Sequence, residues 1–177
     1  MSWLPEGFEH PARLDLASGH HLRPIRADDV DIDFPAVMGS RARLWSIYGE
    51  AWGWPPATMT PEQDRDDLAY HEDEMATAGS YNYAVLDTEE RHLLGCVYID
   101  PPVHADADAV VSWWVVDDEV GGRLDAALAD AVPRWLEMSW PFTTVFFGVE
   151  SVDDDPEDGP EGDTGDAPGK ASGSAPT

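Results

Sequence analysis

Three short runs rich in aromatic and β-branched residues lie close together in the middle of the chain, and they constrain the fold most. They span residues 81–86, 93–99 and 109–116. Such runs are typical of β-strands, and the polar stretch 87–91 is short enough to be a hairpin turn. The third run is almost continuously apolar, which predicts a central strand. The sequence therefore predicts an antiparallel meander in this region.

Helical periodicity is found on both sides of these strands. Apolar residues at helical spacing predict a first helix over residues 34–48 and a second over 61–78. Thr60 stands in a capping-box pattern directly before the second helix. A third helix is predicted over residues 119–139, with a kink at Pro133, because proline cannot donate the helical hydrogen bond.

Two further strands complete the pattern, at residues 21–25 and 142–149. The order becomes β-α-α-β-β-β-α-β, in which a meander precedes a strand-helix-strand crossover. This order predicts the α/β (α+β) class, with a mixed, mainly antiparallel twisted sheet flanked by helices.

Composition divides the chain into three parts, with boundaries near residues 19 and 150. Residues 1–19 are expected to be an extension and residues 20–150 the folded domain. Residues 151–177 are rich in Gly, Pro, Asp and Ser, and they are expected to form a disordered acidic tail because they cannot bury enough apolar surface to offset their ordering entropy. The extension could dock through apolar residues: Trp3, Leu4, Phe8, Leu14 and Leu16.

The chain is strongly acidic, with 36 Asp and Glu against 10 Lys and Arg and a net charge of −26. The tail holds eight acids and one lysine, a net charge of 1 − 8 = −7, so residues 1–150 keep −26 + 7 = −19. Self-repulsion of this size destabilises a compact state, and molar salt screens it. We therefore expect a halophilic protein; the alternative is an acidic protein of a high-GC genome, in which arginine replaces lysine. Nucleic acid is excluded as a partner, because phosphate binding needs basic surface.

The expected location is the cytoplasm. Cys96 is the single cysteine, which fits a reducing compartment. The first residues do not have the pattern of a signal peptide, and no apolar run is long enough for a membrane span. No His, Cys or acidic spacing predicts a metal site, and no P-loop or dinucleotide fingerprint is present.

Over residues 20–149 the order of elements resembles the GNAT superfamily of N-acyltransferases. The opening segment HLRPIRADDVD is similar to the family's first strand and the turn into its first helix, and the meander with its crossover is similar to the acyl-CoA-binding core. The resemblance implies acetyl-CoA as acyl donor and direct attack by an amine. It also implies that the fourth and fifth strands splay into a slot for the pantetheine arm, and that the following helix presents backbone N–H groups to the pyrophosphate.

Residues 115–125 resemble the family's phosphate-binding stretch V-x-P-x-[YF]-[RQ]-x-x-G-x-[GA] without a gap. The departures are Val120 at the Arg or Gln position and Arg123 and Asp125 at the two glycine positions. Gly121 and Gly122 keep the loop permissive, and Arg123 could face a phosphate; alternatively, the two glycines form only a turn before a helix. The resemblance implies these cofactor-binding residues: Trp114, Val115, Val116, Val120, Gly121, Gly122, Arg123 and Leu124.

Acyl transfer to an amine needs a base, an acid and oxyanion donors. The resembled family often takes its acid from a tyrosine on a later helix, but here the fold-like sequence stops at Val149 and no tyrosine follows Tyr98. The acid must therefore come from elsewhere or from water, or the chemistry is absent. Tyr98 and Trp114 are candidates for lining the cleft, and backbone N–H groups of residues 114–116 could bind an oxyanion. The candidate bases, each of which could instead have a structural role, are Glu50, His71, Asp100 and Ser112.

An aromatic cluster between the first two helices falls where the resembled family covers its acceptor site. Such a cluster beside Glu50 would suit a cationic amine; the alternative is a satellite core that fixes a Gly- and Pro-rich loop. The expected substrate-binding residues are Trp45, Tyr48, Glu50, Trp52 and Trp54.

The sequence therefore predicts an acyl-CoA-dependent N-acyltransferase that transfers an acetyl group to a small amine or a peptide amine. The alternative is a non-catalytic GNAT-like module that binds a ligand or a protein, and a third hypothesis is an interaction protein that acts through its acidic tail. A homodimer is possible because the C-terminal part of the resembled fold is missing.

Overall fold

A computed structural model of the chain describes residues 3–103 and 106–150. It contains one six-stranded sheet in which the strands follow one another in sequence order. Neighbouring strands are antiparallel, except that β5 and β6 run parallel. The strands are β1 (Leu14–Asp15), β2 (His21–Pro24), β3 (Tyr81–Leu86), β4 (Leu93–Asp100), β5 (Ala109–Val115) and β6 (Val145–Phe147).

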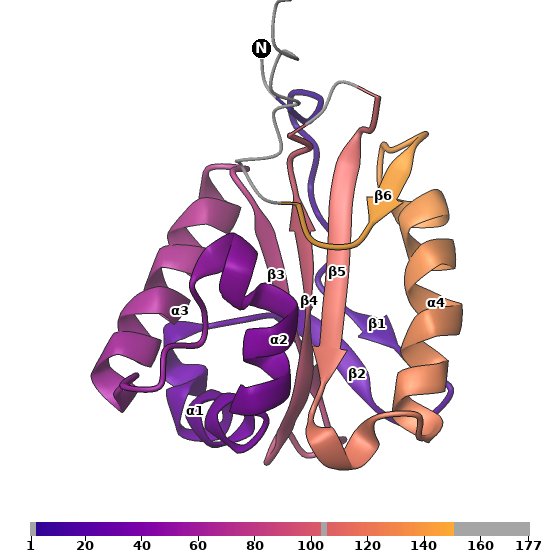
Figure 1. The fold of residues 1–177 in the computed structure, drawn as a ribbon. Coiled ribbons are helices and arrows are strands. Elements are labelled where there is room, and N and C mark those ends of the chain that lie inside the picture. Colours follow the sequence, from indigo (N-terminus) through magenta and orange to yellow (C-terminus); the bar gives the residue numbers. More distant parts are fainter. Residues whose placement is uncertain (1–2, 104–105, 151–177) are drawn as a thin grey trace, which may run out of the picture.

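Four α-helices flank this sheet. Figure 1 shows α1, α2 and α3 together on one side of the strands and α4 on the other. The mixed, mainly antiparallel sheet flanked by helices that the sequence predicts is confirmed. The helices are α1 (Val30–Gly39), α2 (Arg41–Trp52), α3 (Pro61–Ala76) and α4 (Arg123–Ser139).

The single helix predicted over residues 34–48 is wrong, because the chain breaks at Ser40 into α1 and α2. Gly39 and Ser40 are weak helix formers, since glycine loses much backbone entropy and serine competes for backbone hydrogen bonds. The Ser40 side chain is buried and its Oγ accepts a hydrogen bond from the Asp117 N–H at 3.0 Å. The break therefore ties the first helices to the turn after β5.

The capping box predicted before the second helix is confirmed at the start of α3. The Gln63 N–H donates to Thr60 Oγ1 at 3.3 Å, and the Thr60 N–H donates to Gln63 Oε1 at 3.0 Å. The third helix begins at Arg123 rather than at residue 119, because Asp117–Glu119 form a 3-10 turn. It continues through Pro133 to Ser139.

The N-terminal residues pack onto the sheet. Leu4 and Leu16 are buried, Trp3 packs on the core, and the Trp3 indole N–H donates to the Asp108 carbonyl at 2.7 Å. The strand β1, which the sequence analysis did not predict, pairs with β2. The three-part division of the chain stays a prediction, and the proposed tail lies outside the described residues.

The strand β5 carries the feature on which the site depends. β6 pairs with Ala109–Val111, so the remaining residues of β5, 112–115, have β4 on one side and, among the described residues, no strand on the other. The run predicted as a strand over residues 142–149 forms ladder pairs at 145–147 alone. On the paired side β4 lies very close to β5, where a Cβ at Gly95 would fall 2.1 Å from the Trp114 carbonyl oxygen.

Within the described residues, no helix is both long enough and apolar enough to span a bilayer. The same residues contain no cluster of three or more His, Cys, Asp or Glu side chains placed to hold a metal ion.

Candidate active site

β5 and β6 separate beyond Val111, so that among the described residues the backbone of β5 at 112–115 has an open edge, which we call the slot. Figure 1 shows that the chain leaves β6 and crosses in front of β5; the Gly148 N–H donates to the Val111 carbonyl at 3.0 Å. Two residues beyond Val111, the ring of Trp113 meets the ring of Phe147 edge-on, at a centroid distance of 6.1 Å. At the far end Arg43 donates to the Val115 carbonyl and, through Nε, to Asp117 Oδ1 at 2.7 Å.

The N-terminus of α4 lies at that same end of β5. The described residues provide no acceptor for the N–H groups of Arg123 and Leu124, so these N–H groups are free to bind an anion. The other predicted anion-binding groups are already engaged. The Gly121 N–H donates to Asp125 Oδ2 at 2.8 Å, and Arg123 Nη2 donates to the Ala17 carbonyl at 3.1 Å.

The remaining predicted cofactor-binding residues divide between surface and core. Val120 is exposed, whereas Val115 and Leu124 are buried in the core and Val116 packs against it. Trp114 does not project over the open edge of β5. Its ring is buried against Trp54, at a centroid distance of 6.3 Å.

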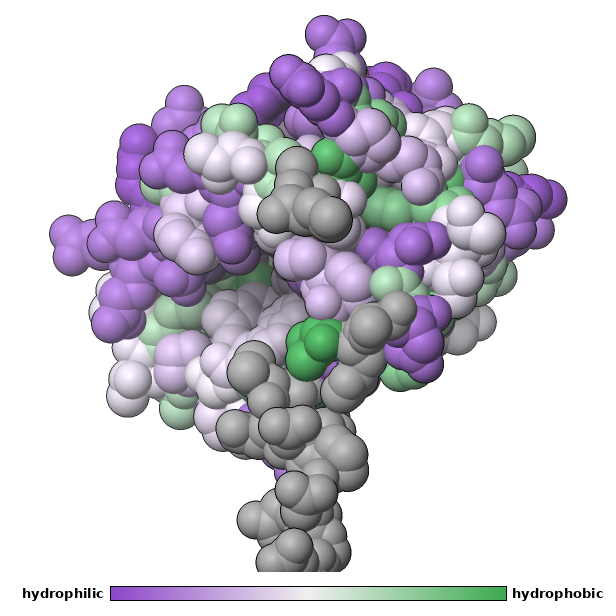
Figure 2. Space-filling model, turned by 90° about the horizontal axis from the view of Figure 1, so that it is seen from above, coloured by the Kyte–Doolittle hydropathy of each residue, from purple (hydrophilic) through white to green (hydrophobic). Residues whose placement is uncertain are grey.

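A cavity of about 690 Å³ lies beside the slot, bounded by α3 and by the ends of β3 and β4. Figure 2 looks at the molecule from the upper end of Figure 1 and shows a hollow in that face, with hydrophilic residues around it. The cavity is lined by Ile25, Asp33, Trp52, Trp54, Asp64, Asp67, Leu68, Tyr70, His71, Glu74, Ser80, Asn82, Cys96, Tyr98, Asp100, Pro101, Val103, Val110 and Glu150.

Two of the predicted catalytic residues line this cavity. Tyr98 accepts a hydrogen bond from Trp114 Nε1 at 2.8 Å, and burial raises the pKa of Tyr98 well above its ordinary value. Asp100 Oδ1 accepts a hydrogen bond from Ser80 Oγ at 2.6 Å, and burial raises the pKa of Asp100. Ser112 lies behind the wall, where its hydroxyl accepts a hydrogen bond from the Tyr48 hydroxyl at 3.3 Å.

The predicted aromatic cluster is divided by the structure. Trp52 and Trp54 line the cavity, and Tyr48 is buried beneath them, stacked on Trp52 at a centroid distance of 4.5 Å. Trp45 is 43% exposed and carries Arg41 over its ring at 5.4 Å. Glu50 is exposed too. Neither Trp45 nor Glu50 lines the cavity.

The cavity contains acids that the sequence analysis missed. Asp33 and Asp64 are 3% and 2% exposed, and burial raises the pKa of Asp33 well above its ordinary value and that of Asp64 to about 6. Part of this set has a signal in the sequence, because Asp64, Asp67, His71 and Glu74 recur at helical spacing on the thin apolar face of α3. Asp33 has none, since nothing in the sequence shows that α1 turns it inward.

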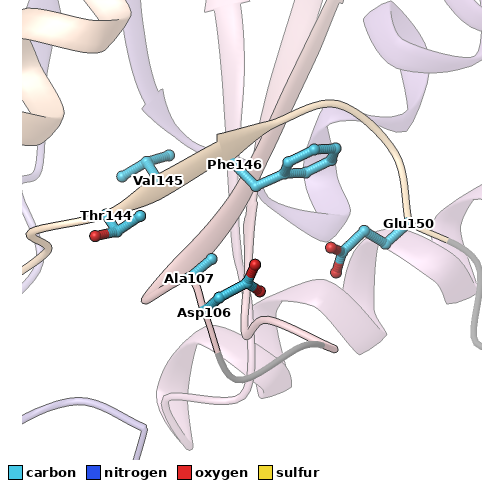
Figure 3. A pocket seen from close by; sticks show the side chains of 6 residues that line it. All are labelled: Asp106, Ala107, Thr144, Val145, Phe146 and Glu150. Carbon is cyan, nitrogen blue, oxygen red and sulfur yellow. The ribbon is translucent and has the colours of Figure 1, made fainter.

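A second, smaller hollow of about 470 Å³ lies beside β6. Figure 3 shows the carboxylates of Asp106 and Glu150 on the same side of β6, near the ring of Phe146. Glu150 also reaches the larger cavity and accepts a hydrogen bond from the Val103 N–H at 3.1 Å. No residue predicted to be catalytic or to bind a ligand lines this second hollow.

Comparison with solved structures identifies the fold as that of GNAT acetyltransferases. The chain is similar to RimL, a ribosomal alpha-N-protein acetyltransferase, at a TM-score of 0.56 and 14% identity, over 76% of this chain and 69% of that one. It is similar to a ribosomal-protein-alanine acetyltransferase from Vibrio fischeri at a TM-score of 0.50 and 17% identity, over 67% of this chain and 64% of that one. It is also similar to the spermidine N-acetyltransferase from Vibrio cholerae, solved with CoA and spermine. Here the TM-score is 0.51 and the identity 10%, over 73% of this chain and 70% of that one.

At these identities the likeness shows the fold, and the GNAT fold predicted from the sequence is confirmed. The chain spans 64 to 70% of the length of these three structures. No protein-family model matches the sequence, and a search of curated proteins gives no match.

Proposed function

We propose that the protein is an acetyl-CoA-dependent N-acetyltransferase that acts on a small amine or a peptide amine. The observation that carries the proposal is the meeting of the open edge of β5 with the acidic, aromatic cavity. Strand register places Tyr98 opposite Ser112, where β6 has left the sheet, and Asp100 opposite Val110. An acyl donor along the edge and an amine in the cavity would therefore meet beside Tyr98 and Asp100. The known activities of the GNAT neighbours support the same reaction.

The residues of the slot fit acetyl-CoA, which would supply the acetyl group as a thioester. The backbone of β5 beyond Val111 can pair with the pantetheine arm as a strand pairs with its neighbour. The free N–H groups of Arg123 and Leu124 can bind the phosphates. The Arg123 side chain could add to this binding only by leaving the Ala17 carbonyl.

Asp100 and Tyr98 would move the protons. Asp100 is the base, because burial raises its pKa and makes its carboxylate a better acceptor for the proton of an incoming ammonium. Tyr98 is the acid: its raised pKa keeps the phenol protonated, so that the hydroxyl has a proton to give to the departing thiolate. The hydrogen bond from the Trp114 indole holds that hydroxyl in place.

Two variants test these roles. Tyr98→Phe should lower kcat by about a hundredfold to ten-thousandfold with little change in KM for the amine, since acid-base groups contribute about 10² to 10⁴ in rate. Asp100→Asn should lower kcat and abolish the fall in kcat at acidic pH, because the ionisable base is gone. Glu50→Gln, which removes a predicted but exposed acid outside the cavity, is the matched control and should leave both parameters unchanged. Wild-type kcat in either active-site variant would contradict the assignment.

One observation favours a second candidate, a GNAT-fold module that binds a ligand without catalysis. The Asp125 carboxylate accepts the hydrogen bond from the Gly121 N–H, which would otherwise be available to a phosphate. The negative charge of Asp125 would also repel a phosphate. Asp125→Ala distinguishes the two candidates. In an acetyltransferase it should tighten acetyl-CoA binding by about threefold to tenfold, as expected for removing a like charge at a helix N-terminus. A non-catalytic module without a cofactor site should bind no acetyl-CoA in either form.

We further propose that the protein acts in a salt-rich cytoplasm and associates as a homodimer. The charge of −26 and the buried Cys96 thiol support the first point. Gel filtration in molar KCl tests the second: an apparent mass near twice 19.4 kDa is expected, and elution as a monomer at all concentrations would refute it.

A further inference from the structure

The larger cavity contains two buried polar atoms that lack partners among the described residues. They are Asp64 Oδ2 and Asn82 Nδ2, and both residues line the cavity while being only 2% exposed. The Asp64 carboxyl is hydrogen-bonded to the carboxyl of Asp33, but Asp64 Oδ2 has no donor among the described side chains. A buried carboxylate oxygen without a donor is costly, and so is a buried amide N–H without an acceptor. Such atoms in a cavity wall point to groups of a ligand: a cationic donor for Asp64, and a ligand or water oxygen for Asn82.

The charged residues around Asp64 indicate the charge of that ligand. The described residues of the cavity wall include no lysine or arginine. Asp67, Glu74 and Glu150 add to the negative potential of the wall, and His71 lies hydrogen-bonded to Glu74 at 3.0 Å. A cation that enters this cavity therefore finds several carboxylates and no competing side-chain ammonium or guanidinium.

The aromatic wall sets the shape of the rest of the ligand. Trp52 and Trp54 face the cavity from the end of α2 and the loop after it, and Tyr70 faces it from α3. Aromatic faces attract ammonium groups and also pack against methylene chains. An aliphatic chain with a positive charge at each end matches these walls better than a neutral or acidic amine.

We propose that the acceptor is a diamine or longer aliphatic polyamine, held by the ammonium that is not acetylated at the unpartnered carboxylate oxygen of Asp64. The proposal rests on the proposed acetyltransferase function for the role of the second nitrogen, which reaches Tyr98 and Asp100. The binding of the first ammonium rests on the cavity alone, so it can be measured without acetyl-CoA.

The test is calorimetric titration of 1,4-diaminobutane and n-butylamine into the full chain at matched ionic strength, without acetyl-CoA. The diamine should bind about tenfold or more tightly than the monoamine, the range expected for one charge-assisted hydrogen bond. Asp64→Asn, which keeps the shape of the side chain, should reduce this preference to about twofold or less. Asp66→Asn removes one exposed acid from the same helix and should keep the preference.

Equal binding of the two amines by the wild-type protein would overturn the proposal, and so would a diamine preference that survives in Asp64→Asn. If Asp64→Asn does not fold, the wild-type comparison decides. Diamine binding without any acetylation would refute the proposed function and leave this site in place. Equal acetylation of both amines with equal KM would refute this site and leave the function in place.

Discussion

Replacing Asp64 by asparagine should stabilise the protein at neutral pH, although the residue lies in the proposed substrate site. Burial raises the pKa of Asp64 from 3.8 to about 6 in the folded protein. The hydrogen bond with Asp33 and the charge of His71 lower this pKa in part, and the charge of Asp67 raises it. Between these two values the folded chain binds a proton that the unfolded chain has released. The free energy of unfolding therefore falls as the pH rises from about 4 to about 6, and stays at the lower level above that.

The size of the effect follows from the shift of roughly two pKa units. At 1.36 kcal/mol a unit, the ionised carboxylate costs the folded state about 3 kcal/mol at pH 7. An uncharged amide at this position avoids the cost of the charge, although its N–H groups need acceptors. Asp64→Asn should therefore be more stable by up to about that amount, or at most roughly 6 to 12 °C in Tm for a chain of this size. At about pH 4 both proteins carry a neutral group there, and their stabilities should be nearly equal.

The assay is thermal unfolding of wild type, Asp64→Asn and Asp66→Asn from pH 4 to pH 8 in KCl of about 1 M, where surface charges are screened. Asp66→Asn corrects for the removal of one charge from the same helix. The reasoning is refuted if Asp64→Asn is no more stable than wild type at pH 7, or if its advantage is as large at pH 4 as at pH 7. A stabilised variant that has lost diamine binding would show that this carboxylate is kept at a cost in stability.

Three further predictions concern packing, substrate contact and salt. Gly95→Ala should destabilise the protein by about 3 kcal/mol or more in denaturant titrations, because its Cβ would fall 2.1 Å from the Trp114 carbonyl oxygen and the two strands must move apart; a loss below about 1 kcal/mol would contradict the strand spacing. Trp52→Ala should raise KM for a cationic amine by about fivefold to thirtyfold in steady-state kinetics, whereas Trp45→Ala, outside the cavity, should leave it unchanged. The Tm should rise with KCl from about 0.05 M to about 2 M as the charge of −26 is screened, and a flat or falling curve would argue against adaptation to salt.

Most of the fold could be predicted from local patterns. The central strands and α3 have strong periodicity or capping signals, and the structure places them within a few residues of the predicted bounds. The break at Ser40 could not be predicted, because it depends on a hydrogen bond to Asp117, which is 77 residues away in sequence. β1 was missed since only two residues pair, and such a short ladder depends on its neighbour rather than on its own sequence.

The candidate site was predictable in part. Tyr98, Asp100, Trp52 and Trp54 are brought together because alternate residues of β4 face the end of α2. The acids of the cavity were not predicted, because the chain has 36 acids and the helical spacing that places Asp64 on the apolar face of α3 is a weak signal among them. Burial is a tertiary property, and here it separates the acids that shape the site from those on the surface.

The central claim is tested most directly by titrating acetyl-CoA into the folded protein in KCl of about 1 M, with Arg123→Glu beside it and Arg134→Glu as control. Arg134 lies on the same helix, away from its N-terminus, and pairs with Asp130. Micromolar binding that weakens by about tenfold or more in Arg123→Glu and persists in Arg134→Glu is the expected result. No binding by a demonstrably folded sample would contradict the acetyltransferase assignment and leave a GNAT-fold protein that binds amines.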